Sequence, residues 1–442
     1  MTVAERLAAH ATKLSFDDLP TEVVQAIKHV LLHDLAVGIG GCRDAESQRA
    51  VAFARRADGA VGDATIIGHP DQASPINAAF ANAVIMRAWR QEDTMHPFGL
   101  HSGPMIMPAA LALGELRGTS GRDLITAVAA GYDVVAALAD GQQSSVDMSY
   151  RTPSHVYGAF ATATTAARLL GLEPDRMVAA LAYAGNLAVT ISTGFANHNY
   201  GLVVRNGMTA AFLGEAGAPA RAETFEGPGG FFDMHFKPEP DRLEEQLTAL
   251  GAGHPVLKTV CKPHPCTGAN LASFALVRRI MDRAGLSGPD VAEVMVRVDK
   301  RTLLVPGLAD PGPWPDVFRQ ISSVRYGIGC ILVDGEVTSA RLQTPNDPLV
   351  SEASRRVRVG CHDDAEQTNH VVTIRTRAGA TYEEAGDFTD IPATDSAAIL
   401  EREADGRLGA ARAAQLKHSV EHLDELDSIA ELTALLRPAT SS

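Results

Sequence analysis

Residues 89–104, WRQEDTMHPFGLHSGP, carry more hydrogen-bonding side chains than the end of a helix or an ordinary loop requires. Two histidines, His96 and His101, flank a short apolar run, and Arg90 precedes the Glu-Asp-Thr run 92–94. A metal site is one interpretation, but no H-E-x-x-H pattern or nearby Cys and Asp set completes four ligands. A histidine that only caps a helix end is a second interpretation. The third is a functional pocket, and the residue types leave all three open.

A second dense stretch, VCKPHPCTGAN, covers residues 260–270. Two prolines, Pro263 and Pro265, closely follow Lys262; they stiffen the backbone and would aim the ammonium group. An aimed lysine near other cations can have a lowered pKa and serve as a base. The alternative is an ordinary surface lysine. Cys261, His264 and Cys266 give only a C-x4-C spacing without a second pair, which is a weak indication of zinc.

Other motifs and the composition exclude several classes of protein. EGPGGFF (226–232) lacks the GxGxxG spacing of a dinucleotide site, and no GxSxG elbow of a serine hydrolase occurs. The net charge of −14, without a basic patch, argues against a nucleic-acid partner, while a small cationic pocket for an anionic substrate stays possible. We expect no membrane span and no signal peptide, and five scattered cysteines do not form a disulfide framework, so the expected location is the cytoplasm.

The elements that must position these residues divide into two kinds. Residues 1 to about 260 predict a series of alanine-rich helices, one of them after Pro20 and stopped by the glycines at 38–41, and another opened by Pro108. Residues 291–299 and 370–388 alternate like half-buried strands, with a turn at 378–379, and 270–285 is a helical stretch of the same region. From about Asp395 the helical pattern returns. The fold class is therefore mainly α with an α+β domain. We place residues 1–265 and 395–442 in an all-helical domain built from both chain ends, and 266–394 in a smaller inserted α+β domain.

Six stretches, taken in their order and spacing, resemble the MmgE/PrpD family over most of the chain. They are DLAVGIGG (34–41), EDTMHPFGLHSGPMIMPAALALGE (92–115), AARLLGLEPDRMVAALAYAG (166–185), RNGMTAAFLGEAG (205–217), EGPGGFF (226–232) and CKPHPC (261–266). The resemblance implies the two-domain arrangement above, usually a homodimer, and an active site in the cleft between the domains. It also implies an enzyme that uses neither a metal nor an organic cofactor.

The sequence departs from the pattern of the family's lyases at several polar positions. The leading aspartate of their D-x-D-D-T-H-like motif falls on Arg90, while Thr94 and His101 match later members of it. Their H-P-T-G histidine falls on Thr152, with His155 three residues on. The lysine and the histidine of their K-x-L-H-A-G motif fall on Ala196 and Asn199. Lys262 matches the lysine of the K-P-Y-P-C-like motif, with His264 at its tyrosine, and Tyr326 resembles the tyrosine of an S-x-x-Y segment.

These replacements, with the positive charge that remains, predict a reaction on a highly charged polycarboxylate. Removing a proton next to a carboxylate builds up negative charge that fixed cationic donors stabilise. We therefore expect a cofactor-independent epimerase of iminodisuccinate, within what the resemblance allows. The predicted catalytic residues are Lys262, His101 and Tyr326, and the predicted substrate-binding residues are Arg90, Thr94, His96, Asn199, Arg205, His264 and Arg325, with no metal ligand. The alternatives are a lyase of the 2-methylcitrate dehydratase or cis-aconitate decarboxylase type, and a noncatalytic carboxylate-binding protein.

Overall fold

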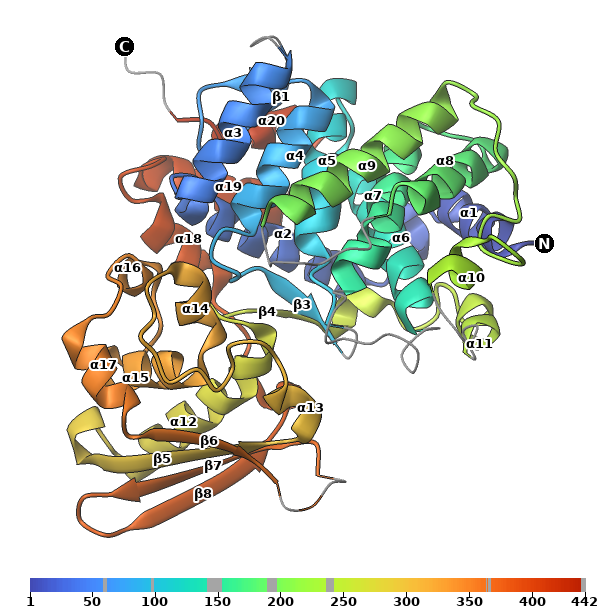
Figure 1. Cartoon of the computed structure of the whole chain (residues 1–442). Helices are drawn as coiled ribbons and strands as arrows, with labels where there is room; N and C mark the ends of the chain where they lie inside the picture. Colours follow the sequence, from blue (N-terminus) through green and yellow to red (C-terminus); the bar gives the residue numbers. More distant parts are fainter. Residues whose placement is uncertain are drawn as a thin grey trace. The chain divides into compact units, whose positions relative to one another are not determined.

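The computed structural model describes residues 1–58, 62–96, 99–140, 153–188, 197–235, 242–362, 364 and 367–438. The chain forms two compact units. The first, the helical unit, consists of Met1–Ala88, Glu92–Cys261 and Asp395–Ser442. The second, the α+β unit, consists of Trp89–Gln91 and Lys262–Thr394, whereas the sequence placed this boundary at 265/266. The fold class is mainly α with an α+β part, as the sequence predicted (Figure 1).

The helical unit is built around α7 (Pro153–Leu169), whose residues 153–167 are all buried. Helices α5 (Gly103–Arg117), α6 (Gly121–Asp140), α8 (Pro174–Asn186) and α9 (His198–Glu215) pack against α7 (Figure 1). Small residues allow this close packing, because a Cβ added at Gly207 of α9 would meet the Thr162 side chain of α7. The remaining helices of the first part of the chain are α1 (Val3–Lys13), α2 (Thr21–Gly41), α3 (Ala45–Asp58), α4 (Pro75–Met86), α10 (Phe231–His235) and α11 (Leu243–Thr248).

Helix α2 ends within the predicted glycines 38–41: it passes through Gly38 and Gly40 and stops at Gly41. A Cβ on Gly41 would meet Ala88 at 2.7 Å, so this glycine serves close packing. Pro108 lies inside α5, which begins five residues earlier at Gly103, because Pro104 already occupies the first turn where a missing N–H costs nothing.

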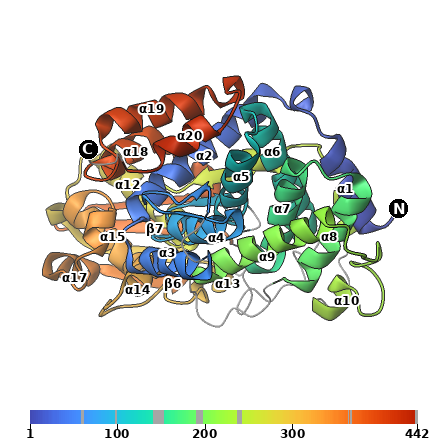
Figure 2. The same ribbon diagram turned by 90° about the horizontal axis from the view of Figure 1, so that it is seen from above.

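Both ends of the chain contribute to the helical unit. Helices α18 (Ser396–Ala404), α19 (Ala410–Glu421) and α20 (Ala430–Leu435) follow the α+β segment, and α18 packs against α2 (Figure 2). The Ser396 hydroxyl lies 3.2 Å from Nδ1 of His33 on α2. By length and composition α2 could cross a membrane, but most of its apolar window is buried inside the unit, as in a core helix.

Short strands interrupt the predicted all-helical pattern of this unit. β1 (Ala64–Thr65) pairs with β2 (Gln72–Ala73), and β3 (Asp93–Met95) pairs antiparallel with β4 (Thr259–Cys261). In the second ribbon Thr94 lies opposite Val260. This pairing fixes the backbone of residues 93–95, the centre of the stretch that the sequence singled out.

The α+β unit contains a four-stranded sheet with the order β6-β5-β7-β8. β5 (Val291–Val298), β7 (His370–Thr376) and β8 (Thr381–Gly386) follow the predicted alternation, with the turn at Gly379, whereas β6 (Val357–Cys361) was not predicted. β5 and β6 are parallel and the other pairs antiparallel. Helix α12 (Leu271–Ala284) packs on β7 and β8, and α15 (Val324–Asp334) packs on β6. The shorter helices of the unit are α13 (Lys300–Leu303), α14 (Val317–Ser322), α16 (Ser339–Leu342) and α17 (Pro348–Ser354).

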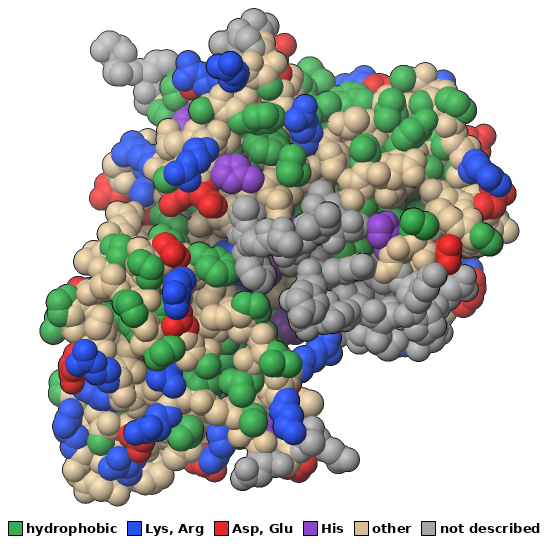
Figure 3. Space-filling view, viewed as in Figure 1, with side chains coloured by type: hydrophobic (Ala, Val, Ile, Leu, Met, Phe, Trp, Pro, Cys, Tyr) green, Lys and Arg blue, Asp and Glu red, His purple; other side chains and the backbone are tan. Residues whose placement is uncertain are grey.

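Ion pairs on the sheet mark its solvent side. The Glu293 carboxylate accepts hydrogen bonds from Arg375 and Arg358 on the neighbouring strands, and these bonds lower the pKa of Glu293. Acidic and basic side chains are accordingly interspersed over this unit in the space-filling view (Figure 3). Such exposed pairs contribute little to stability, so the unit is held mainly by the packing of α12 and α15 on the other face.

Candidate active site

A carboxylate and a histidine from residues 92–101 form a close pair in the helical unit. Nδ1 of His101 lies 3.0 Å from Oε1 of Glu92, 3.0 Å from the Asp93 carbonyl oxygen and 3.1 Å from the Thr94 hydroxyl. A carbonyl and a carboxylate only accept hydrogen bonds, so Nδ1 carries the hydrogen. In the neutral ring the lone pair is then on Nε2. The side chain of His101 is 13% exposed, whereas that of Glu92 is fully buried.

The backbone around His101 explains why its ring is held in place. Leu100 forms a β-bridge with Met95, so the chain returns sharply from β3 toward α5. The backbone N–H of His101 donates to the Ser154 hydroxyl of α7 at 2.9 Å. Pro97 and Phe98 lie outside the described residues. His101 is therefore anchored between the β-bridge at Leu100 and the start of α5.

Arg87 completes a buried charged group with Glu92. The guanidinium group forms an ion pair with Oε1 of Glu92, and both side chains are almost entirely buried. Burial by itself would lower the pKa of Arg87, but Glu92, Tyr200 and Asp93 together outweigh burial, and the pKa is raised. Arg87 therefore stays charged and balances Glu92, which contacts His101 on the same oxygen.

Aromatic contacts bring two more residues to this cluster. The guanidinium carbon of Arg87 lies 4.5 Å from the centroid of the Tyr200 ring. The rings of His155 and His101 lie 5.2 Å and 6.3 Å from the same ring. Tyr200 comes from α9 and His155 from α7, whereas Arg87 caps the C-terminal end of α4 and Glu92 directly precedes β3. We call Arg87, Glu92, His101, His155 and Tyr200 the histidine cluster.

Two buried carboxylates, Asp34 and Asp93, lie at the start of α5 next to the cluster. Oδ1 of Asp93 accepts the N–H of Gly103 at 2.8 Å, and the Tyr132 hydroxyl donates to Oδ2 at 3.3 Å. A Cβ on Gly103 would meet the carboxylates of both Asp34 and Asp93, so only glycine fits at the start of α5. Burial and the nearby Asp93 and Asp34 carboxylates raise the pKa of Tyr132, and burial together with the same carboxylates raises that of Cys261. Tyr132 therefore stays a neutral hydrogen-bond donor.

In the α+β unit the best-defined predicted residue is Lys262. Its side chain is fully buried, which rules out the surface-lysine interpretation. Nζ donates to the Arg90 carbonyl oxygen at 2.9 Å, and the Gln91 amide donates to the Pro263 carbonyl oxygen at 3.1 Å. Arg90 has a left-handed backbone, with φ of 51°, and its guanidinium carbon lies 4.6 Å from the centroid of the Phe318 ring. Lys262 thus holds the short segment 89–91 within this unit.

Tyr326, predicted to be catalytic, is engaged in local structure. Its hydroxyl donates to the Arg341 carbonyl oxygen at 3.3 Å, and its ring packs edge-on against Trp314 with centroids 5.4 Å apart. Burial raises the pKa of Tyr326. A buried hydroxyl that is bonded to a carbonyl is a poor proton donor, so the geometry of this unit favours a structural role. Arg325, next to it, and His264 are partly buried in the same unit.

The other predicted residues are spread over the helical unit. Thr94 contacts the ring of His101, as described above. Asn199 lies in the first turn of α9, directly before Tyr200. Arg205 lies further along α9, where its guanidinium carbon is 5.5 Å from the centroid of the Phe53 ring of α3. The His96 backbone N–H donates to the Lys258 carbonyl oxygen at 3.0 Å. The structure thus joins Thr94 to His101 and places Arg205 against α3.

Several members of the cluster were missing from the predicted site. Arg87 precedes the stretch 89–104 by two residues, and Tyr200 directly follows Asn199. Both are polar residues next to predicted site positions, and this is the only sequence pattern that could have indicated them. His155 stands three residues after the position of the histidine in the family's lyases, and the sequence did not predict it as a site residue. Thr152 and Ala196, which stand at the positions of the family lyases' histidine and lysine, lie outside the described residues.

Comparison with known proteins agrees with this architecture. The family model described as MmgE/PrpD N-terminal domain matches residues 5–244, which is more than half of the chain. The chain therefore belongs to the MmgE/PrpD family. The buried arginine–glutamate–histidine group lies within the matched residues.

Individual relatives in that family carry an activity in their names. Cis-aconitate decarboxylase of Aspergillus terreus is 25% identical over 408 residues, which is 84% of this chain and 81% of the relative. Cis-aconitate decarboxylase of Mus musculus is 24% identical over 408 residues, or 87% and 82% of the two chains. The cis-aconitate decarboxylase-like protein oryM of Aspergillus oryzae is 28% identical over 291 residues, or 60% and 59%.

Proposed function

We propose that this protein is a lyase acting on a polycarboxylate, with cis-aconitate as the first candidate substrate. Two findings support the proposal. The relatives that align with most of the chain are named cis-aconitate decarboxylases. The observation that carries it is the Glu92–His101 pair, in which a buried carboxylate holds the Nδ1–H side of a histidine ring, the arrangement of a histidine that transfers a proton through Nε2. The comparisons favour this lyase reading over the predicted epimerase.

The reaction needs a proton and a place for negative charge. Breaking the bond between the methylene carbon of cis-aconitate and its carboxylate releases CO2, and the electron pair moves through the double bond. Negative charge then accumulates on the carbon next to a remaining carboxylate. Protonation of that carbon gives itaconate, so each turnover consumes one proton and needs no oxidant. Fixed donors and cations in a partly dry site stabilise the charged intermediate better than water does.

His101 is the proposed acid. A protonated imidazole would donate from Nε2, while the Glu92 carboxylate at Nδ1 stabilises the ring in its charged form and fixes its orientation. Arg87 holds Glu92 in place and balances its charge when the ring is neutral. Tyr200 and His155 line the same cluster and are the proposed contacts for a substrate carboxylate.

Epimerisation of iminodisuccinate remains a second candidate because of Arg90. This cation stands where the family's lyases usually have an acid, and a substrate with four carboxylates would benefit from the added positive charge. An epimerase would remove a proton from the carbon that bears the amine and return one to the opposite face. Lys262 as the base of such a reaction stays a prediction.

Proton NMR in D2O tests both candidates with the same protein. The full chain would be mixed separately with cis-aconitate, 2-methylcitrate and single-stereoisomer iminodisuccinate. We expect the vinyl signals of itaconate from cis-aconitate, and we expect His101→Gln to lose at least about 100-fold in rate, the lower range for general acid catalysis. His418→Ala, at the exposed end of α19, is the matched control and should turn over normally. A second iminodisuccinate diastereomer with loss of the α-proton signal would instead establish the epimerase. Binding without any exchange or product would favour a noncatalytic carboxylate-binding protein.

A further inference from the structure

The last turn of α19 carries two histidines and a glutamate in the sequence HSVEH, residues 418–422. His418 and His422 are four residues apart, which places both side chains on the same face of the helix, one turn from each other. Glu421 comes directly before the second histidine. The spacing is that of H-x-x-E-H, a pattern in which two histidines one turn apart bind a metal ion.

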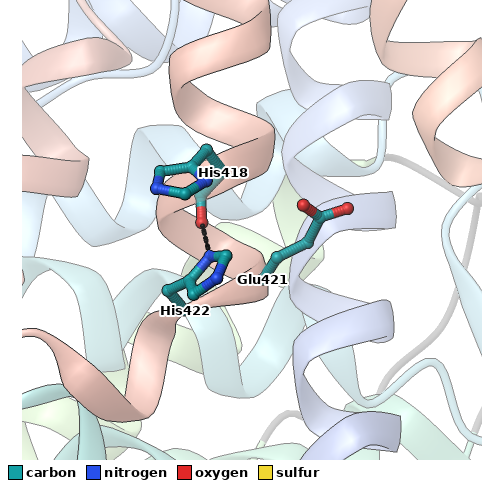
Figure 4. A group of neighbouring side chains, drawn as sticks. All are labelled: His418, Glu421 and His422. Atoms are coloured by element: carbon teal, nitrogen blue, oxygen red, sulfur yellow. Dashed lines mark hydrogen bonds between the residues drawn. The ribbon is translucent and has the colours of Figure 1, made fainter.

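The three side chains lie close enough to share one ion. One ligand atom from each of His418, Glu421 and His422 lies within 4.8 Å of the other two. The two rings face each other with centroids 4.2 Å apart and planes inclined by 40° (Figure 4). His418 and Glu421 are exposed and His422 is half-buried, so an ion could reach the group from solvent.

A hydrogen bond selects the nitrogen of His422 that can bind a metal. Nδ1 of His422 lies 3.0 Å from the His418 carbonyl oxygen (Figure 4). The carbonyl only accepts, so Nδ1 carries the hydrogen and Nε2 keeps its lone pair. Histidine ligands in metal sites are commonly oriented in this way, with the other ring N–H donated to a backbone carbonyl. This hydrogen bond is an observation separate from the histidine spacing, and it also indicates a metal site.

The end of α19 is also held rigidly and is electrically suited to a cation. Leu416 and Val420 of the same turns are buried, and the Glu421 carbonyl oxygen accepts from Lys28 Nζ of α2 at 2.8 Å. Lys28 in turn forms an ion pair with Asp424. The C-terminal end of a helix carries partial negative charge, which favours a bound cation.

We propose that His418, Glu421 and His422 form a binding site for a divalent transition-metal ion of the Zn²⁺ type. Two imidazoles and one carboxylate suit Zn²⁺, Ni²⁺ or Cu²⁺, whereas Ca²⁺ and Mg²⁺ prefer sites made only of oxygen ligands. The protein supplies three ligands, and the fourth position stays open to water or to another molecule. The site lies on α19, outside the histidine cluster, and does not depend on the proposed lyase reaction.

Calorimetric titration of the full chain with zinc sulfate, after treatment with a chelator, tests the proposal. We expect a saturable 1:1 site whose affinity falls at least about tenfold in His418→Ala and in His422→Ala, since loss of even a supporting hydrogen bond weakens metal binding by about 10- to 100-fold. Gln415→Ala, an exposed position one turn earlier on α19, is the matched control and should bind zinc like the wild type. Calcium chloride should give no such site.

Two results would overturn the assignment. One is a wild-type protein that binds no zinc at a 1:1 ratio. The other is a zinc site of unchanged affinity in both histidine variants, which would place the ion on other histidines or cysteines of the chain. Circular dichroism and turnover should be unchanged in all three variants, because the positions are at least partly exposed and lie outside the histidine cluster.

Discussion

Replacing Glu92 by glutamine is the sharpest test of the proposed proton donor. The amide keeps the size of the side chain but removes the charge that lies between Arg87 and His101. It can also present its NH2 group to Nδ1 of His101, which would force the hydrogen onto Nε2 and leave the neutral ring in the wrong tautomer. Both the charge balance and the orientation of the histidine would therefore be lost at once.

The expected magnitudes follow from burial. Glu92 and Arg87 are 0% and 6% exposed, and breaking a buried ion pair by removing one charge costs about 3–5 kcal/mol. The glutamine oxygen can still accept a hydrogen bond from Arg87, so we expect the lower end, about 3 kcal/mol. Forcing the wrong tautomer in a comparable carboxylate–histidine pair lowers kcat by about 10⁴-fold. We expect a loss of at least about 10³-fold here, with a much smaller change in KM.

Initial rates of itaconate formation, measured by NMR or by absorbance, would be combined with thermal unfolding of each variant. Glu115→Gln is the matched control, because the Glu115 carboxylate accepts from the Thr65 N–H at 2.8 Å and hydroxyl at 2.7 Å outside the histidine cluster. That variant should lose some stability and keep its turnover. A folded Glu92→Gln protein with more than a tenth of the wild-type kcat would refute the role of the Glu92–His101 pair.

Three further perturbations test the α+β unit. Lys262→Met keeps the buried chain but not the ammonium group, and it tests the sequence prediction that Lys262 is a base. Loss of a base should lower turnover at least about 100-fold, whereas a rate within about fivefold of wild type would limit Lys262 to holding segment 89–91. Burial lowers the pKa of His370 to about 4, whereas a histidine in the unfolded chain has a pKa of about 6.5. Between these pH values only the unfolded chain binds the proton, so the free energy of unfolding should fall by up to about 3 kcal/mol as pH drops from 6.5 to 4. His370→Gln should flatten that part of the curve in denaturant titrations, and a slope equal to wild type would argue against it. Arg90→Gly should leave the unfolding free energy within about 1–2 kcal/mol of wild type, while KM for the polycarboxylate rises; an unchanged KM would remove Arg90 from substrate binding.

The elements of the fold could be predicted where one pattern dominates locally. β5 and β7 each alternate over part of their length, and their spans agree closely with the sequence prediction. The sequence does not say which of the glycines at 38–41 ends α2, because glycine has two uses that look alike: it stops helices, and it lets another segment approach closely. Gly41 packs against Ala88, a contact that only the folded structure reveals. β6 is a short strand, and a five-residue pattern gives too few alternations to detect.

The candidate site shows the same division between near and distant contacts. Thr94 and His101 are seven residues apart, so local sequence was enough to group them. His155 and Tyr200 reach the cluster from helices far along the chain, and their partners depend on how α7 and α9 pack. Buried support is harder still to predict: Asp34 and Asp93 were not among the predicted site residues. A Cβ added at Gly103 would meet both carboxylates, which shows that they are packed against the start of α5.

Arg90 shows why a residue type alone can mislead about what a position does. The sequence suggested that a reversed charge at this position changes the substrate. In the structure the Arg90 backbone carbonyl receives the Lys262 ammonium group, and a carbonyl is present whatever the side chain is. The lysine can therefore keep its partner while residue 90 changes from an acid to a base. The left-handed backbone at φ of 51° costs any residue except glycine about 1–2 kcal/mol, so Arg90 is retained there against a conformational penalty. That penalty is the reason to expect a role for the guanidinium group beyond its contact with Phe318, and Arg90→Gly separates the role of the side chain from that of the backbone.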